Sequence, residues 1–328
     1  MNWVFITLIS ALILGSINLI DKKCHQYCKY PGTYMMLCGF THASFGIVCM
    51  AIVGFSNSIP EIYYVSIFDN ILISLNLPTK PLLYAILSGG TLGFAVYLTQ
   101  KIIFSGEVSR TMPIAQSYPI FSSLLAAMFL NEIMSSLQWI CILVTVLGCI
   151  LLTIRFDKIT SFSPGSIFKE KSFYILILSS LLFAISFIFG KLAFSYVGLS
   201  ALFIHGVRAT CGGVILFSGS IRSSNARSEL FSFIRQGKPK SFFFLNGLNN
   251  FVIAQVGFAL MIWGLELGPV SLVTALSSTR TLFTVIFSIV LGFIWKGALG
   301  ERNTNQDMTL KIGSTLLIVA GVSGISIF

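Results

Sequence analysis

The sequence predicts an all-α polytopic membrane protein whose ten transmembrane helices form two inverted five-helix repeats. Three observations predict this fold class: an apolar composition, a series of apolar stretches of about 20 residues each, and a second half that repeats the first. Of the 328 residues, 55% are hydrophobic and 10% are charged, whereas soluble domains carry roughly 25% charged residues. A soluble globule could not cover so much apolar side chain, because much of any globule is surface.

Ten stretches are long and apolar enough to cross the hydrocarbon core of a bilayer as helices. In chain order they are residues 3–20, 33–55, 81–104, 108–130, 137–154, 173–194, 200–219, 242–265, 270–295 and 310–328. Residues 1–155 then form the first repeat, residues 172–328 form the second, and residues 156–171 are a basic connecting loop.

One further apolar stretch, residues 56–80, is interrupted by Glu61, Asp69 and Asn70. These polar residues favour a segment that lies at the membrane interface over one that crosses the bilayer. Leaving this stretch out of the spans also keeps the basic loops on one side of the membrane.

The net charge of +10 would suggest a nucleic-acid partner in a soluble protein. Here the basic residues lie in loops, with no basic patch interleaved with aromatics, so we expect no nucleic-acid binding. With ten spans, the even-numbered loops hold only Lys80 and, at a helix end, Lys191. The positive-inside rule therefore places the odd-numbered loops in the cytoplasm and both termini outside. We expect the membrane to be a bacterial inner (plasma) membrane.

An internal repeat joins the two halves of the sequence. Residues 105–125 align without a gap with residues 267–287, and the matched positions are Gly106, Val108, Ser109 and Phe121 with Gly268, Val270, Ser271 and Phe283. GFTHASFGIV, from Gly39, matches GVRATCGGVI, from Gly206, and SALILGSINL, from Ser10, aligns with SLLFAISFIF, from Ser180. Because each half holds an odd number of spans, the two halves must be inverted in the bilayer.

Several short motifs occur in a characteristic order. They are LGSINL at residues 14–19, the proline-containing MPIAQSYPIFSSLLAAMFLNE ending at Glu132, LQWICILVTVLGCILL at 137–152, FGKLA with Lys191, and Arg208 in the seventh helix. Together with the duplication, they make the chain resemble the drug/metabolite transporter superfamily, in its ten-span EamA-like branch, over nearly the whole length.

The resemblance implies a secondary transporter that works by alternating access. Its two inverted halves would enclose a central cavity lined by helices one, three, four, six, eight and nine, with contributions from two and seven. The chain departs from the family pattern where Pro119 aligns with Thr281 and where Arg280 stands beside it. Ten-span relatives are usually drawn with cytoplasmic termini, opposite to the orientation that the charges predict.

Charged residues inside a membrane are costly and therefore indicate candidate sites. Arg280 lies about ten residues into the ninth helix and shares a face with Ser277 and Thr284 at helical spacing. We interpret it as a cavity cation that binds a carboxylate or phosphate of the solute. The alternative is a structural arginine bonded to backbone carbonyls or to a glutamate.

Three more basic residues are candidates for solute contact. Arg208 is central in the seventh helix, and His205 lies one turn earlier, where it could titrate near neutral pH. The alternative for this pair is helix packing. Lys191 lies near the end of the sixth helix, where it binds solute or reaches the interface.

Polar residues within apolar helices are the remaining candidates. Tyr97, Gln116, Tyr118 and Asn250 either contact solute or bond neighbouring helices. Pro113 and Pro119 free backbone carbonyls in the fourth helix and would act as kinks or hinges.

The distribution of acids guides the choice of solute. The first helix, taken as residues 3–20, offers Ser10, Ser16 and Asn18 but no acid. Central arginines without a central acid favour a small anionic or zwitterionic metabolite, such as an amino acid or organic acid. The alternatives are a cationic-compound exporter of the same fold and a receptor or scaffold without transport.

Other classes of site find little support in the sequence. The three His residues are scattered and the acids lie at helix ends, so we predict no enzyme activity and no cofactor. Cys24 and Cys28 flank His25 in a predicted loop, but a structural zinc site needs four ligands, so we expect free thiols and no metal. The expected partners are a small-molecule solute and the lipid bilayer, with a coupling ion and a homodimer left open.

Overall fold

The computed structural model describes residues 2–55, 79–105, 114–151, 171–195, 200–236, 240–284 and 286–287, with short pieces between residues 309 and 324. The described residues are almost all helical and contain no strand. Most of the predicted interfacial segment 56–80 and of the connecting loop 156–171 lies outside them; only their last residues begin helices.

Six helical runs are long and apolar enough to cross a membrane. They are α1 (Asn2–His25), α2 (Pro31–Phe55), α3 (Thr79–Ser105), α8 (Lys171–Leu192), α9 (Ala201–Ile221) and the run formed by α11 (Lys240–Gly247), η4 (Leu248–Ile253) and α12 (Ala254–Leu267). Shorter helices are α5 (Tyr118–Phe129), α6 (Ser136–Leu151) and α13 (Val270–Ser277). The prediction of a helical membrane fold is confirmed, whereas the count of ten spans stays a prediction.

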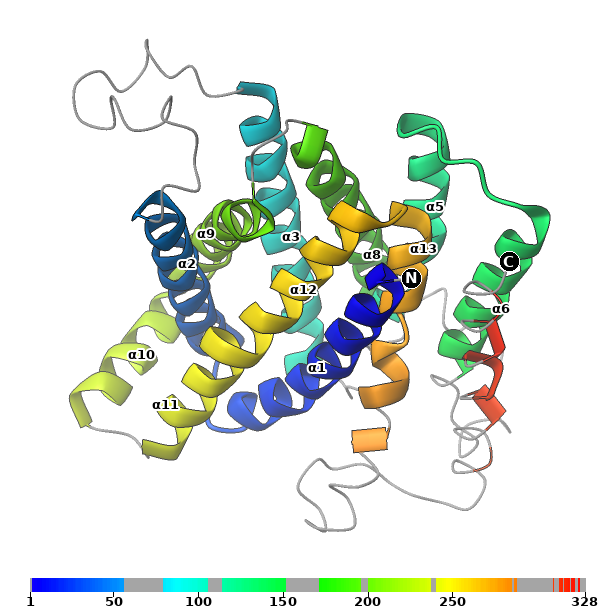
Figure 1. The fold of residues 1–328 in the computed structure, drawn as a ribbon. Helices are drawn as coiled ribbons and strands as arrows, with labels where there is room; N and C mark the ends of the chain where they lie inside the picture. Colours follow the sequence, from blue (N-terminus) through cyan, green and yellow to red (C-terminus); the bar gives the residue numbers. More distant parts are fainter. Residues whose placement is uncertain are drawn as a thin grey trace.

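The helices pair in a pattern that fits two inverted repeats (Figure 1). α1, the first predicted helix, packs on α12, which belongs to the eighth. α8, the sixth predicted helix, packs on α3, the third, so the first and sixth predicted helices have equivalent partners. α2 packs on α9 and α5 on α13, which pairs each helix with its own counterpart in the other repeat. The last described residues lie against α6, where Gly148 faces Ile318.

Matched hydrogen bonds support the same relationship. The Ser10 hydroxyl of α1 donates to the carbonyl of Gly257 in α12 at 2.7 Å. In the other half, the Ser179 hydroxyl of α8 donates to the carbonyl of Ala95 in α3 at 2.9 Å. Ser10 therefore corresponds in space to Ser179 and not to Ser180, so the sequence alignment of these two helices is wrong by one residue.

A second matched pair lies at the helix ends. Lys22 donates from its ammonium to the carbonyl of Ile103 near the end of α3, at 3.1 Å. Lys191 donates to the carbonyl of Leu265 near the end of α12, at 2.7 Å. Lys22 and Lys191 are as far apart in the chain as Ser10 and Ser179, so one register accounts for both pairs of bonds.

Equivalent helices of the two repeats are also interrupted at the same place. Turns at Gln116–Ser117 and at Ser278–Thr279 precede helical residues that start at Tyr118 and at Arg280. The Ser117 hydroxyl donates to the Ile114 carbonyl, and the corresponding Thr279 hydroxyl donates to the Leu276 carbonyl. Such local bonds compete with the helical ladder. The predicted continuous helices over 108–130 and 270–295 are therefore broken within their described parts.

Two other features were not predicted. Ser224–Gln236 forms a helix, α10, within a predicted loop. The π-helical turn η4, Leu248–Ile253, interrupts the eighth predicted helix. Single π-helical turns are rare and often occur at functional sites.

Candidate functional site

The ends of the helix bundle differ in charge. Among the described residues, the end where α1, α3 and α9 finish carries Lys22, Lys23, Lys29, Lys101, Lys171, Arg222, Arg227, Arg235 and Lys240. The opposite end carries Lys80, which is exposed, and Lys191. We call the first of these the basic end.

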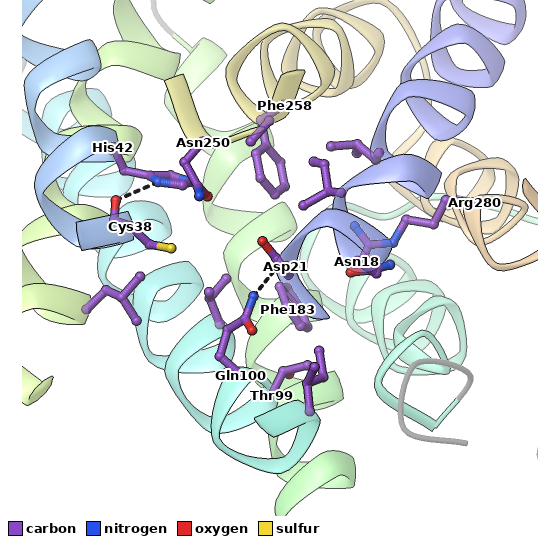
Figure 2. A pocket seen from close by; sticks show the side chains of 16 residues that line it. Asn18, Asp21, Cys38, His42, Thr99, Gln100, Phe183, Asn250, Phe258 and Arg280 are labelled. Carbon is purple, nitrogen blue, oxygen red and sulfur yellow. Dashed lines mark hydrogen bonds between the residues drawn. The ribbon is translucent and has the colours of Figure 1, made fainter. Parts of the chain in front are cut away.

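A cavity of about 60 Å³ lies between the helices in the half of the bundle toward the basic end (Figure 2). This volume has room for a few water molecules. Its walls come from α1, α2, α3, α8, α9, the η4–α12 run and the segment after α13; the polar lining residues are Asn18, Asp21, Cys38, His42, Thr99, Gln100, Asn250 and Arg280.

Asp21 is the main difference from the sequence prediction. α1 continues through His25 and does not end at Ile20, so the acid lies within the helix. Its side chain is 2% exposed and faces the cavity. The expectation that the first helix carries no acid is therefore wrong. Cys24 and His25, assigned to a loop by the sequence, occupy the last turn of the same helix.

Three helices supply hydrogen-bond donors to the Asp21 carboxylate. Tyr34 of α2 donates its hydroxyl to Oδ1 at 2.5 Å. Asn249 of η4 donates Nδ2 to the same oxygen at 2.7 Å. Gln100 of α3 donates Nε2 to Oδ2 at 2.5 Å, as Figure 2 shows. Since a buried carboxylate is costly without partners, this convergence explains how the fold holds an acid here.

Arg280 lines the same cavity and is 8% exposed. Its Nε is buried and has no hydrogen-bond partner among the described residues. The turn at Ser278–Thr279 immediately precedes Arg280, so this residue stands at the break in the ninth predicted helix, residues 270–295. Arg280 thus lines a cavity, while its predicted role in binding solute stays a prediction.

Asn250 is the other predicted residue that lines the cavity. Its Nδ2 donates to the Tyr34 hydroxyl at 2.9 Å and to Asn246 Oδ1 at 3.1 Å. It stands within the π-helical turn beside Asn249, so this turn places two neighbouring amides on the inward side.

Arg208 occupies a different place. It is 1% exposed, and it lines a smaller cavity of about 30 Å³ that shares His42, Val96 and other residues with the first. Its Nε donates to the Ser88 hydroxyl at 2.6 Å and its Nη2 to the Ser186 hydroxyl at 3.0 Å. These bonds join α9 to α3 and α8, as the packing alternative predicts.

His205 and Lys191 do not line either cavity. His205 Nε2 pairs with Gln255 Oε1 at 3.1 Å. Lys191 donates to the carbonyls of Leu265, Glu266 and Gly268 at 2.7, 3.2 and 2.9 Å. All three N–H donors of this ammonium have acceptors, so Lys191 caps the end of α12.

The predicted neighbours of Arg280 make helix-to-helix bonds. The Tyr118 hydroxyl and the Ser277 hydroxyl lie 2.7 Å apart and join α5 to α13. Thr284 donates to the Gly15 carbonyl of α1 at 2.8 Å. These three residues lie around Arg280 without lining the described cavity.

The remaining predicted residues are dispersed. Gln116 is 1% exposed, and both polar atoms of its amide lack partners among the described residues. The Tyr97 ring packs beside Gly219 of α9. Pro119 lies in the first turn of α5, where a proline is tolerated, and Pro113 lies outside the described residues.

Apolar side chains fill the half of the bundle away from the basic end. Phe187, Met261 and Ile262 belong to one buried cluster together with Tyr118, and Phe183 of the same cluster borders the cavity. By the register of the matched bonds, Ile262 and Met261 stand where Gln100 and Thr99 stand in the polar half. The two ends of the bundle therefore share a backbone arrangement, but polar residues surround a cavity toward the basic end and apolar side chains fill the opposite end.

Sequence reasoning missed Asp21, Asn18 and His42 as cavity residues, and Asn249 as a hydrogen-bond partner of Asp21. A signal was present for the first two: Leu14, Asn18, Asp21 and His25 recur at helical spacing and continue the inward stripe of α1 past Ile20. The other two depend on contacts between distant helices.

Comparisons with known proteins agree with this architecture. The sequence matches the EamA-like transporter family over residues 1–154 and again over residues 171–327. A crystal structure of another protein is similar with a TM-score of 0.64 and 14% identity, over 99% of this chain and 95% of that chain. No curated protein matches the sequence.

Proposed function

Because the chain belongs to the EamA-like transporter family, a family of membrane transporters of the drug/metabolite type, we propose that it moves a small anionic or zwitterionic metabolite by alternating access. An amino acid or organic acid is the expected class of solute. The chain is a multi-pass integral membrane protein, and we place it in a bacterial inner membrane with ten spans.

The observation that carries the proposal is the state of Arg280. This guanidinium lines the cavity, is almost fully buried, and its Nε lacks a protein acceptor among the described residues. A buried cation requires an acceptor, and a solute carboxylate or phosphate would supply one. The amides of Asn18 and Asn250 would bond the remaining polar groups of the solute.

The inverted architecture and the difference between the two ends of the bundle support alternating access. Inverted repeats allow the same helix contacts to open on either side of the membrane in turn. In this conformation the cavity lies toward the basic end, and the cluster of Phe187 and Met261 fills the opposite half. The positive-inside rule makes the basic end cytoplasmic, with both termini outside. Solute would enter as the helices around the narrow cavity separate.

Asp21 favours a second candidate, the export of cationic compounds. It is an acid in the same cavity as Arg280, and a cation could pair with it. The three donors already bonded to its carboxylate make it a less available partner than Arg280, so the anionic or zwitterionic solute remains the first choice.

The test is counterflow in liposomes containing the purified full chain. Labelled amino acids, carboxylates, phosphorylated metabolites and cationic dyes are offered separately. We expect uptake of one anion or zwitterion, lost in Arg280→Ala and weakened in Arg280→Lys, which keeps the charge but not the guanidinium geometry. Arg222→Ala, at the exposed end of α9, is the matched control and should transport normally. Dye uptake that is indifferent to Arg280→Ala would instead support the cationic alternative.

A further inference from the structure

The Asp21 carboxylate is joined to a histidine through a glutamine. Gln100 donates Nε2 to Asp21 Oδ2 at 2.5 Å, and its Oε1 lies 2.9 Å from His25 Nε2. The carboxylate only accepts hydrogen bonds, so the amide nitrogen must face it and the amide oxygen must face His25. His25 therefore carries its proton on Nε2. Its Nδ1 is buried and has no partner among the described residues.

No basic side chain forms an ion pair with Asp21 within the described part of the chain; its partners are Tyr34, Gln100 and Asn249. It is also the one acid there with a buried side chain. Burial favours the neutral acid, whereas three donors favour the carboxylate. These two effects oppose each other at a group that faces the cavity.

We propose that Asp21 exchanges a proton with the cavity during transport, and that Gln100 and His25 rearrange with it. The coupling part of this proposal rests on the proposed transport function. A proton added to Oδ2 makes the acid a donor, so the Gln100 amide turns over and accepts with Oε1. Its Nε2 then donates to His25 Nε2, which has lost its hydrogen while Nδ1 has gained one.

The proton count of this rearrangement balances. The carboxylate gains one proton, and the imidazole keeps the same number because one proton leaves Nε2 and one arrives at Nδ1. Tyr34 and Asn249 continue to donate to Oδ1. The network thus has two fully bonded arrangements that differ by one proton, which is the requirement for a two-state switch.

Asp21 and His25 are the two groups of this network that change protonation or tautomer in the proposal. The other titratable or charged groups near Asp21 are Lys22 and Cys24 on α1, Tyr34 and Cys38 on α2, and Arg280 across the cavity. His42 of α2 also lines the cavity, but its Nδ1 bonds the Cys38 carbonyl and, among the residues that the structure describes, it makes no bond to the Asp21 network. Lysine, cysteine, tyrosine and arginine ordinarily titrate above neutral pH. From α3 and η4 the facing groups are the neutral amides of Gln100 and Asn249.

The position of the network links the proton to the cavity. Its residues come from α1, α2, α3 and η4, and Asp21 and Gln100 line the cavity itself. Removing the charge of Asp21 weakens charge-assisted bonds that hold these four elements together near the basic end. Proton binding thereby makes it easier for these helices to separate, as they must do to admit solute.

The first test is solid-state NMR of the full chain in liposomes, labelled with ¹⁵N-histidine. We expect His25 to change from the Nε2–H to the Nδ1–H tautomer as the pH falls, together with a protonated carboxyl band in infrared spectra. Asp21→Asn places an amide N–H where the acid would carry its proton, so it should fix His25 as Nδ1–H at every pH and remove the band. His42, which bonds to the Cys38 carbonyl, is the internal control and should not change. A His25 tautomer that is independent of pH in the wild-type chain would overturn the proposal.

The second test separates coupling from transport. Counterflow of each class of labelled solute offered above is measured in liposomes with and without a pH difference, and the ratio of the two uptakes of the transported solute is the readout. We expect a ratio of at least three in the wild-type chain and of one in Asp21→Asn. Wild-type counterflow with a ratio of one would overturn proton coupling alone. A chain without counterflow of any solute would contradict the proposed function, while the NMR result would still decide the protonation switch.

Discussion

Ser88 of α3 and Ser186 of α8 exchange hydrogen bonds: each hydroxyl donates to the other residue's carbonyl, at 2.6 and 2.8 Å. Both hydroxyl oxygens also accept from the Arg208 guanidinium. Three helices therefore meet at one closed polar contact in an otherwise apolar part of the bundle. This contact gives the buried Arg208 guanidinium two neutral acceptors. Among the described residues its Nη1 has no partner.

Ser88→Ala should destabilise the chain by about 1–3 kcal/mol, because it leaves the Arg208 Nε without an acceptor and removes the bond from the Ser88 hydroxyl to the Ser186 carbonyl. Ser186→Ala should have a similar effect. The double variant should lose less than the sum of the single losses, since both act on one network. Unfolding free energies in detergent measure this. Additive losses would show that the two serines do not share the contact.

Lys191→Met should lower stability by about 1–3 kcal/mol by leaving the last carbonyls of α12 without donors. The concentration of solute that gives half-maximal counterflow should not change, because the ammonium is occupied by Leu265, Glu266 and Gly268. Lys80→Met, at an exposed position of the same end, is the control for loss of charge. A weaker affinity for solute in Lys191→Met alone would restore Lys191 as a binding residue.

Much of the fold could be predicted because lipid imposes a simple rule on helix length and composition. The apolar stretches and the repeat were visible in the sequence. Arg280 could be identified as a candidate because a charged residue within an apolar span is costly. The helix ends were less accurate: Asp21, Lys22 and Lys23 were taken as a loop, although α1 continues through them. Lys22 reaches a carbonyl at the end of α3, so its charge does not end the helix.

The cavity itself was harder to predict, since its chemistry depends on side chains far apart in the chain. Asp21 is stable inside α1 only because Tyr34, Gln100 and Asn249 converge on it. No local pattern shows that convergence. The turns before Tyr118 and Arg280 were also missed, although their residues are polar. Ser117 and Thr279 donate to nearby backbone carbonyls and so compete with the helical ladder, but the apolar residues on either side of each turn favoured a continuous helix.

Glu132→Ala should destabilise the start of α13 by about 0.5–2 kcal/mol, the usual cost of losing a cap. Its carboxylate accepts from the Val270 and Ser271 amides at 2.7 and 3.0 Å and from the Ser271 hydroxyl at 2.6 Å. Glu132→Gln keeps one acceptor oxygen and should lose less. Hydrogen exchange at the Val270 and Ser271 amides reports the change directly. Equal protection in the wild type and in Glu132→Ala would show that the cap does not order this helix.

Gly213→Ala should force α2 and α9 apart and lower the yield of folded protein. A Cβ at this position would lie 2.5 Å from the Ala43 nitrogen and from the Gly39 carbonyl oxygen, and backbone atoms cannot move aside as a side chain can. Overpacking of this kind costs about 1–3 kcal/mol or more. Gly247→Ala is the matched control, because a Cβ there meets nothing within 4 Å and alanine favours the helix by about 1 kcal/mol. Thermal unfolding in detergent should therefore move in opposite directions for the two variants, and a shift of the same sign in both would contradict the close contact between α2 and α9.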